Sequence, residues 1–138
     1  METIIPSTFC GCGKDAILKN LQELTDALVA VKGVQAAAIV DYESGMIMSA
    51  SEGRGNEADL EVVMAGGTNI IRAQQKTLSM LHHNDTLRDI LITLQRQYHL
   101  LCPCTQTQNM FIYLILDRQT ANLAICRNAM FCAEAMVS

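Results

Sequence analysis

The chain has 138 residues, of which 50% are hydrophobic and 17% are charged. A chain of this length corresponds most simply to one domain that buries its core without disulfides or metals. The formal net charge of -4 and the lack of a basic cluster argue against nucleic acid as the main partner, so a protein partner is expected.

The N-terminal segment does not resemble a targeting sequence. It lacks the basic and apolar regions of a signal peptide, and nowhere does an apolar run reach the roughly 18 residues that span a bilayer. A cytoplasmic protein without membrane insertion is therefore expected. Residues 1–13 show no periodicity and are predicted to be an irregular leader, followed by a single domain over residues 14–138.

A helix and a hairpin are predicted after the leader. Apolar residues recur every three or four positions up to the natural stop at Gly33, which predicts a helix over about Asp15–Lys32. Two extended runs, VQAAAIVDY and MIMSAS, follow and are joined by the short turn 43–45. This pattern is typical of a β-hairpin.

The longest helical pattern runs from Asn56 to His82. Asn56 is a good N-cap, and acidic residues follow in the first turns, where the helix dipole favours negative charge. One strip of this helix is apolar except for Gln74 and is expected to lie on a sheet. The strip contains Leu60, Val63, Met64, Gly67, Ile71, Gln74, Leu78 and Leu81.

A second strip of the same helix consists largely of small residues. Its members are Val62, Gly66, Ala73 and Met80, with Asn69 and Lys76 interleaved. An internal glycine costs roughly 1 kcal/mol relative to alanine, so the Gly66-Gly67 pair requires an explanation. Close approach of another helix explains it, and a kink at the paired glycines is the alternative. A third, polar arc is available to water or to a partner protein.

Three strands and a helix are predicted in the remainder of the chain. The strands are DILITLQ, YHLLC after a tight turn at Arg96-Gln97, and MFIYLIL after the loop Pro103–Asn109, and a terminal helix begins at Arg118 or Thr120. Several of these runs are apolar at nearly every position, so helices should cover both faces of the sheet. Short turns require antiparallel neighbours, which predicts an α/β sandwich in the order αββαβββα.

Four segments, taken in order and spacing, resemble the Roadblock/LC7 family, of the bacterial MglB-like type. They are GVQAAAIVDYESG, NIIRAQQ, DILITLQRQYHLL and FIYLILDRQTANLAICR, and the resemblance covers about Leu18–Ala129. It implies a profilin-like, five-stranded antiparallel sheet in the order 2-1-5-4-3, with the central helix on one face and the terminal helices on the other. It also implies a homodimer in which the two third strands form one continuous sheet and the two central helices lie side by side.

Two features of the residues agree independently with such a homodimer. The small-residue strip lacks a neighbour, and an edge strand as apolar as Asp89–Leu94 would be prone to aggregation if it stayed unpaired. The predicted dimer interface comprises Val62, Gly66, Asn69, Ala73, Met80, Ile90, Leu91, Ile92, Thr93 and Leu94.

The resemblance further implies a noncatalytic adaptor that binds a Ras-like small GTPase and modulates its nucleotide cycle or localisation. The predicted partner-binding residues, all on the polar arc or beside it, are Glu61, Thr68, Asn69, Arg72, Gln75 and Lys76. An arginine-finger role for Arg72 is the less favoured interpretation, because arginines on helix surfaces are usually solvated. The sequence lacks a phosphate-binding loop of the G-x-x-x-x-G-K-[ST] type, so neither nucleotide hydrolysis nor a cofactor is expected.

Cysteines provide the main alternative, a thiol- or zinc-based regulator. Two Cys-x-Cys pairs, Cys10 with Cys12 and Cys102 with Cys104, have enough thiolates for a tetrahedral zinc site or a redox pair, although the usual zinc spacing is Cys-x-x-Cys. A third hypothesis is a structural subunit of a larger scaffold. The remaining cysteines, Cys126 and Cys132, are predicted to be small core residues of the terminal helix.

Other polar residues are not expected to form an active site. Asp41, Asp117 and Asn122 lie near element ends, where Asp and Asn commonly satisfy backbone groups. His99 lies in a strand and is expected to be a surface or hydrogen-bonded histidine without a direct chemical role.

Overall fold

The computed structural model describes residues 14–81, 84–107 and 109–137. The predicted leader, including Cys10 and Cys12, and the predicted helix end at His82 lie outside these residues. The elements follow the predicted order. Their bounds are α1 Lys14–Val29, β1 Val34–Asp41, β2 Met46–Glu52, α2 Leu60–Met80, β3 Ile90–Thr93, β4 Gln97–Pro103, β5 Met110–Asp117 and α3 Leu123–Glu134.

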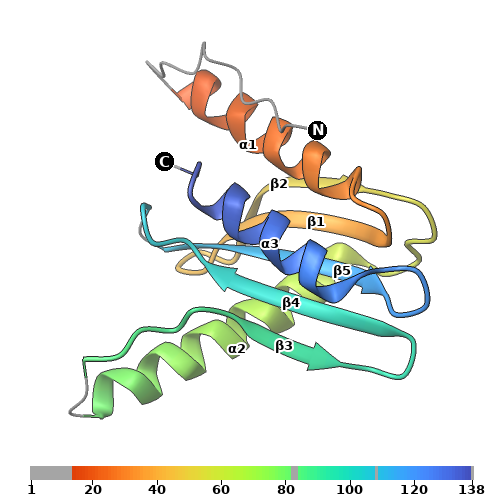
Figure 1. Cartoon of the computed structure of the whole chain (residues 1–138). Helices are drawn as coiled ribbons and strands as arrows, with labels where there is room; N and C mark the ends of the chain where they lie inside the picture. Colours follow the sequence, from red (N-terminus) through yellow and green to blue (C-terminus); the bar gives the residue numbers. More distant parts are fainter. Residues whose placement is uncertain (1–13, 82–83, 108, 138) are drawn as a thin grey trace.

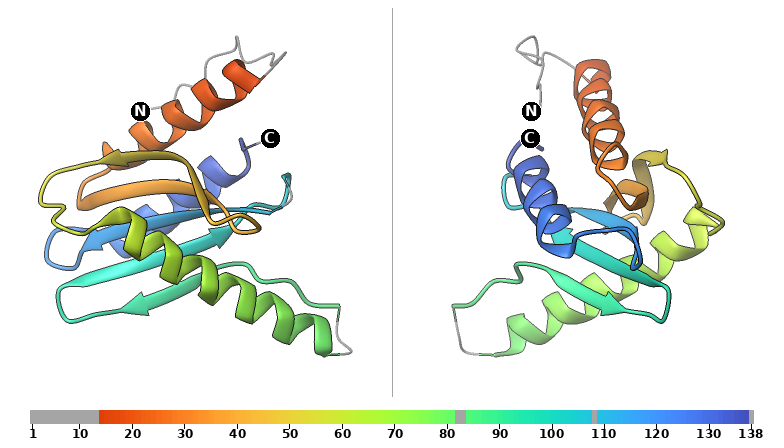
Figure 2. Two further views of the ribbon diagram at one scale, coloured as in Figure 1. Left: turned by 180° about the vertical axis from the view of Figure 1, so that it is seen from behind. Right: turned by 45° about the vertical axis from the view of Figure 1, so that its right-hand side comes forward.

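The five strands form one antiparallel sheet in the order β2-β1-β5-β4-β3, which confirms the fold expected from the resemblance. α1 and α3 cover one face of this sheet and α2 covers the other (Figures 1 and 2). Both edge strands, β2 and β3, are therefore left at the rims of a three-layer sandwich. β3 lies beside α2 and on the side of the sheet away from α1.

The sheet separates two hydrophobic cores, because successive side chains of a strand point to opposite faces. Along β1, Ala37 and Ile39 pack into the core beneath α1 and α3. Ala36, Ala38 and Val40 pack into the core beneath α2. All five side chains are at most 1% exposed. This burial on both faces is why the apolar run of β1 is continuous instead of alternating.

The first helix is shorter than predicted at its C-terminal end. α1 ends at Val29 rather than near Lys32, and a turn leads to Gly33, whose φ is +90°. A Cβ atom at Gly33 would lie 2.4 Å from the Cα atom of Ala121. Gly33 is thus required both by its backbone conformation and by the close approach of the segment before α3.

The central helix begins three residues later than predicted. Asp59 is its N-cap, and the Asp59 carboxylate accepts hydrogen bonds from the backbone N–H groups of Glu61 and Val62 at 3.1 and 3.5 Å. The predicted N-cap, Asn56, was wrong. Its side-chain oxygen accepts a hydrogen bond from the N–H of Ala58 at 3.2 Å, which stabilises a turn before the helix.

The predicted start of the terminal helix at Arg118 or Thr120 was also wrong. Asn122 is the N-cap of α3 and accepts from the N–H of Ile125 at 3.1 Å. Asp117 accepts from the N–H two residues later at 3.0 Å and so stabilises a turn between β5 and α3. The expectation that these two polar residues satisfy backbone groups is therefore confirmed.

The two central glycines of α2 have different surroundings. A Cβ atom at Gly67 would lie 2.6 Å from Cε2 of the buried Tyr113 ring, whereas a Cβ atom at Gly66 would meet nothing within 4 Å. α2 continues through the pair as one helix of 21 residues. Gly67 is therefore explained by the close packing of α2 on β5, and Gly66 is not explained by any contact within the described chain.

We expect Gly67→Ala to lower the free energy of unfolding by about 1 kcal/mol. Overpacking against a buried ring typically costs about 1–3 kcal/mol, and the better helix propensity of alanine offsets only about 1 kcal/mol of it. Gly66→Ala is the matched control and should raise the stability of the monomer by about 0.5–1 kcal/mol. Urea denaturation at a protein concentration that keeps the chain monomeric measures both. Equal effects of the two substitutions would contradict this account.

Candidate functional site

α2 exposes several apolar side chains to solvent, with polar residues among them. Val62 is 67% exposed and Met80 is 64% exposed, and Ile70 and Leu81 are also exposed. The same helix already buries residues such as Met64 in the core of its own domain. An amphipathic helix needs only one apolar strip for that purpose, so a second exposed strip indicates an interaction surface.

β3 is a second exposed apolar feature, at the rim of the sheet. It pairs with β4 and with no other described strand. Leu91 and Leu94 are exposed, whereas Ile90 and Ile92 are partly buried against the core beneath α2. Edge strands are usually protected by charge, proline or a covering segment, and the ILIT sequence of β3 contains neither charge nor proline.

These exposed parts of α2 and β3 form what we name the α2–β3 surface. All five predicted interface residues of α2 are exposed or partly exposed on it, namely Val62, Gly66, Asn69, Ala73 and Met80. Of the five predicted interface residues around β3, Leu91, Thr93 and Leu94 are exposed and the other two are partly buried. α2 crosses the face of the sheet diagonally, and only its C-terminal part comes near β3 (Figure 2), so the two predicted groups are both exposed but are not all adjacent.

The predicted polar arc is exposed or partly exposed with one exception. Glu61, Asn69 and Lys76 are exposed and Gln75 is partly exposed. Thr68 is only 3% exposed, and its hydroxyl donates to the carbonyl of Met64 at 2.9 Å. Its assignment to a partner-binding surface was wrong, because the position next to Gly67 faces the sheet where α2 approaches most closely.

Arg72 joins α2 to the turn between β1 and β2. Its Nε donates to the carbonyl of Tyr42 at 2.6 Å, and its Nη2 donates to the carbonyl of Glu43. The side chain of Glu43 in turn accepts from Nδ2 of Asn109 at 3.2 Å. The guanidinium therefore holds a turn in place. The sequence contained no signal for this role, since both acceptors are backbone atoms about thirty residues away.

The cysteines of the alternative hypothesis are not arranged for thiolate chemistry in the described residues. Cys102 and Cys104 are buried, and burial is the main reason why the pKa of each thiol rises from 9.0 to about 12. Glu134 raises the pKa of both thiols further, and the neighbouring Cys102 thiol also raises that of Cys104. Both thiols stay protonated near neutral pH, and protonated thiols are poor nucleophiles and poor metal ligands.

Metal ligation finds no support elsewhere in the described part of the chain. There, no group of three or more His, Cys, Asp or Glu side chains could hold a metal ion. Of the two remaining cysteines, Cys126 is buried as predicted, but Cys132 is exposed on α3, so its prediction as a core residue was wrong. No helix among residues 14–81, 84–107 and 109–137 is both long and apolar enough to cross a membrane.

Comparison with known proteins identifies the fold. No protein-family model matches the chain, and no curated protein matches it in sequence. Solved structures do match it. A Roadblock/LC7 domain from Streptomyces avermitilis superimposes with a TM-score of 0.70 at 14% identity, over 85% of this chain and 93% of that domain. The chain has the Roadblock/LC7 fold.

Two solved MglB structures share this fold. The gliding protein MglB from Thermus thermophilus has a TM-score of 0.75 at 14% identity, with 88% of each chain covered. MglB in a tetrameric arrangement has a TM-score of 0.76 at 14% identity, also with 88% of each chain covered. The resemblance to the Roadblock/LC7 family stated from the sequence is thus confirmed at the level of the fold.

Thiol labelling tests the assignment of the cysteines. In a variant with Cys10 and Cys12 replaced by serine, we expect an aromatic disulfide reagent at neutral pH to label Cys132 rapidly. Cys102 and Cys104 should react only after unfolding, because burial keeps them covered and protonated. Mass spectrometry of the labelled chain identifies each site, and Cys132→Ser is the control that should remove the rapid phase. Rapid labelling of Cys102 or Cys104 in the folded protein would contradict the assignment.

The raised pKa values of Cys102 and Cys104 predict that the folded protein loses stability at high pH. A folded-state pKa of about 12 lies above the usual value of 9.0, so the folded state binds protons more tightly than the unfolded state. The resulting stability is fully present below pH 9.0 and should decrease between pH 9.0 and about 12. Urea denaturation across this range measures the decrease, which should be smaller in the Cys102→Ala, Cys104→Ala variant. A decrease of the same size in that variant would assign it to other groups.

Proposed function

We propose that this chain is a noncatalytic homodimeric adaptor that binds a Ras-like small GTPase and modulates its nucleotide cycle or localisation. The observation that carries the proposal is the α2–β3 surface, where α2 exposes a strip with apolar and small residues and β3 exposes an apolar strand edge. Residues of this kind favour self-association, since they leave both hydrophobic area and backbone hydrogen-bonding groups unsatisfied.

A two-fold axis beside β3 accommodates both features at once. Two copies of β3 would then pair into a continuous sheet, and the two α2 helices would pack against each other on one face of it. The open space at Gly66 and the small side chain of Ala73 allow their backbones to approach closely. One of the similar proteins, MglB, has been solved in a tetrameric arrangement, which supports self-association through this fold.

The partner class rests on the resemblance to the MglB-like type of the Roadblock/LC7 family. In the proposed dimer the two α2 helices would present duplicated copies of Glu61, Asn69, Gln75 and Lys76 on one surface, without the buried Thr68. Arg72 would support that surface from the side by holding the turn between β1 and β2. Mixed charges and amides of this kind suit a polar, reversible interface with a regulatory partner.

A charge on β3 should disrupt the proposed dimer. In a two-fold pair, Leu91→Lys places two like charges close together across the new strand pair, which is destabilising. We expect the dimer dissociation constant to rise at least about tenfold, equivalent to about 1.4 kcal/mol. Light scattering should show that the wild-type protein has twice the 15.1 kDa mass of one chain. At the same concentration, the variant should have a smaller mass.

Met46→Lys is the matched control for this experiment, because Met46 is 63% exposed on β2, the opposite edge strand. It adds the same charge to the same kind of position and should leave the mass unchanged. A monomeric wild type, or an equal effect of both variants, would reject the proposed dimer.

Binding to the GTPase is tested separately. Small Ras-like GTPases from the same organism, each loaded with GDP or a nonhydrolysable GTP analogue, are titrated against the wild type and Lys76→Glu. Charge reversal in the middle of the proposed surface should weaken binding by about tenfold or more, while Lys32→Glu, a reversal just after α1, should not. Equal binding to the GDP-loaded and the GTP-analogue-loaded GTPase would instead favour the hypothesis of a structural subunit of a larger scaffold. Equal binding by both variants would place the partner on another surface.

A further inference from the structure

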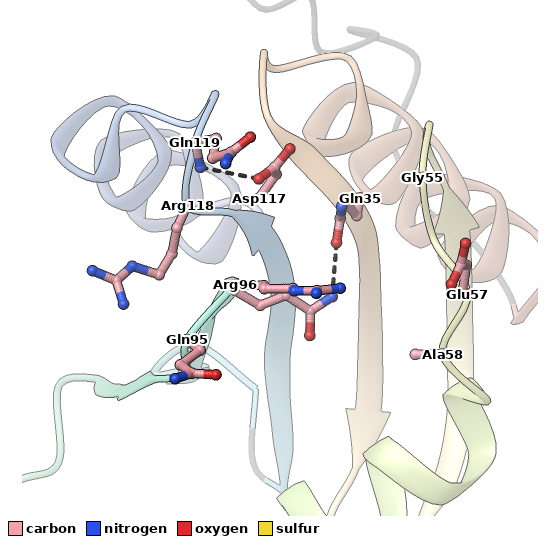
Figure 3. Close-up of a pocket in the computed structure, with 10 residues that line it drawn as sticks. Gln35, Gly55, Glu57, Ala58, Gln95, Arg96, Asp117, Arg118 and Gln119 are labelled. Atoms are coloured by element: carbon pink, nitrogen blue, oxygen red, sulfur yellow. Dashed lines mark hydrogen bonds between the residues drawn. The ribbon is translucent and has the colours of Figure 1, made fainter.

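A polar cavity lies at one end of the sheet, apart from the α2–β3 surface. Its volume is about 720 Å³, within the range of small-molecule sites. Three turns build its walls. The lining residues are Gly55, Glu57 and Ala58 before α2, Gln95, Arg96 and Gln97 where β3 connects to β4, and Asp117, Arg118 and Gln119 at the end of β5, and Gln35 of β1 contributes to the floor (Figure 3).

A chain of four hydrogen-bonded side chains ends in this floor. Tyr113 Oη lies 2.5 Å from Nδ1 of His99, and Nε2 of His99 lies 3.2 Å from Oε1 of Gln97. Gln97 then donates from Nε2 to Oε1 of Gln35 at 2.8 Å. The chain begins beneath α2, where the Tyr113 ring packs against Gly67, and runs across β4 to β1.

The protonation states of His99 and Tyr113 determine which group donates in each hydrogen bond of this side-chain network. Burial lowers the pKa of His99, so the imidazole is neutral at pH 7, and burial raises the pKa of Tyr113 to about 12, so the phenol keeps its proton. The tautomer that satisfies both contacts has Tyr113 donating to Nδ1 and Nε2–H donating to Gln97. Each bond therefore polarises the next toward the cavity.

The last member of the chain presents donors to the cavity. The side-chain oxygen of Gln35 is occupied by Gln97, which leaves the Nε2 amide group of Gln35 as the open end. Gly55, with φ of +82°, lies directly beside it. A Cβ atom at Gly55 would lie 3.2 Å from Nε2 of Gln35, so a side chain there would cover the amide group that glycine leaves accessible.

Charged groups of opposite sign stand on two walls of the cavity. Arg96 reaches across the floor toward Gln35, and Glu57 lies on the facing wall (Figure 3). Arg118 points away, because it donates to the carbonyl of Leu94 at 2.8 Å and stacks on the ring of Tyr98. Within the described residues the one salt bridge joins two other side chains, so Arg96 and Glu57 do not neutralise each other directly.

We propose that this cavity binds a small zwitterion of the amino-acid class. Its carboxylate lies against the Arg96 guanidinium and the Gln35 amide, which are a matched set of donors for a planar anion. Its ammonium group lies against Glu57. A compact anion such as phosphate fits less well, because Glu57 and Asp117 bring two carboxylates to the same lining.

Side-chain amide resonances provide the test, with L-glutamine as the probe. In two-dimensional 1H–15N spectra of the full chain, L-glutamine at millimolar concentration should shift the NH2 signals of Gln35 and Gln97 in a saturable manner. N-acetyl-L-glutamine, which lacks the ammonium group, and L-glutaminamide, which lacks the carboxylate, should each bind at least about tenfold more weakly, about 1.4 kcal/mol.

Single substitutions test whether Arg96 binds the carboxylate of the ligand and whether Glu57 binds its ammonium group. Arg96→Gln should abolish the discrimination against L-glutaminamide, and Glu57→Gln should abolish the discrimination against the N-acetyl compound. Arg54→Gln, an exposed arginine outside the cavity lining, is the control and should bind as the wild type does. Absence of any shift at Gln35 would overturn the proposal. Equal binding of N-acetyl-L-glutamine would also overturn it, since the site would then recognise carboxylates alone.

Discussion

The contact between Gly67 and the ring of Tyr113 is the constraint on which the rest of the arrangement depends. It brings the backbone of α2 close to β5 at a point where any Cβ atom would collide with the ring. Such a contact fixes the rotation of α2 about its own axis. With Gly67, Met64 and Ile71 facing the sheet, the strip that contains Val62, Ala73 and Met80 must face outward, away from the sheet.

The same tyrosine connects this packing to the polar end of the sheet. Its ring faces Gly67, and its hydroxyl is held by His99, so the position of the ring is determined from both sides. One buried residue thus shapes the helix surface that carries the proposed self-association and also begins the hydrogen-bond chain that ends at Gln35. The two proposed surfaces lie on different parts of the molecule but share this element of the core.

Comparison of the predicted and observed features shows which kinds of information a sequence contains. Every helix and strand was predicted within a few residues, because apolar periodicity, turn residues and cap residues are local signals. The main errors were at helix ends. Asn56 and Asp59 are both good cap residues, and only the docking of α2 on the sheet decides between them. Predictions for Thr68 and Cys132 failed for a related reason, since each lies near the border between a buried and an exposed helix face.

The sequence by itself determined the sandwich of helices and antiparallel strands, the second apolar strip on α2 and the unprotected edge of β3. These follow from patterns over a few consecutive turns or strand residues, and the strand order followed from resemblance to a family. Only the tertiary structure decided that Arg72 holds a turn, that Cys102 and Cys104 are buried thiols, and that Gln35, Gln97, His99 and Tyr113 form one chain. Such contacts join residues that are far apart in sequence or on neighbouring strands. Their geometry depends on strand register and on helix rotation, and both are fixed by the packing of the whole domain.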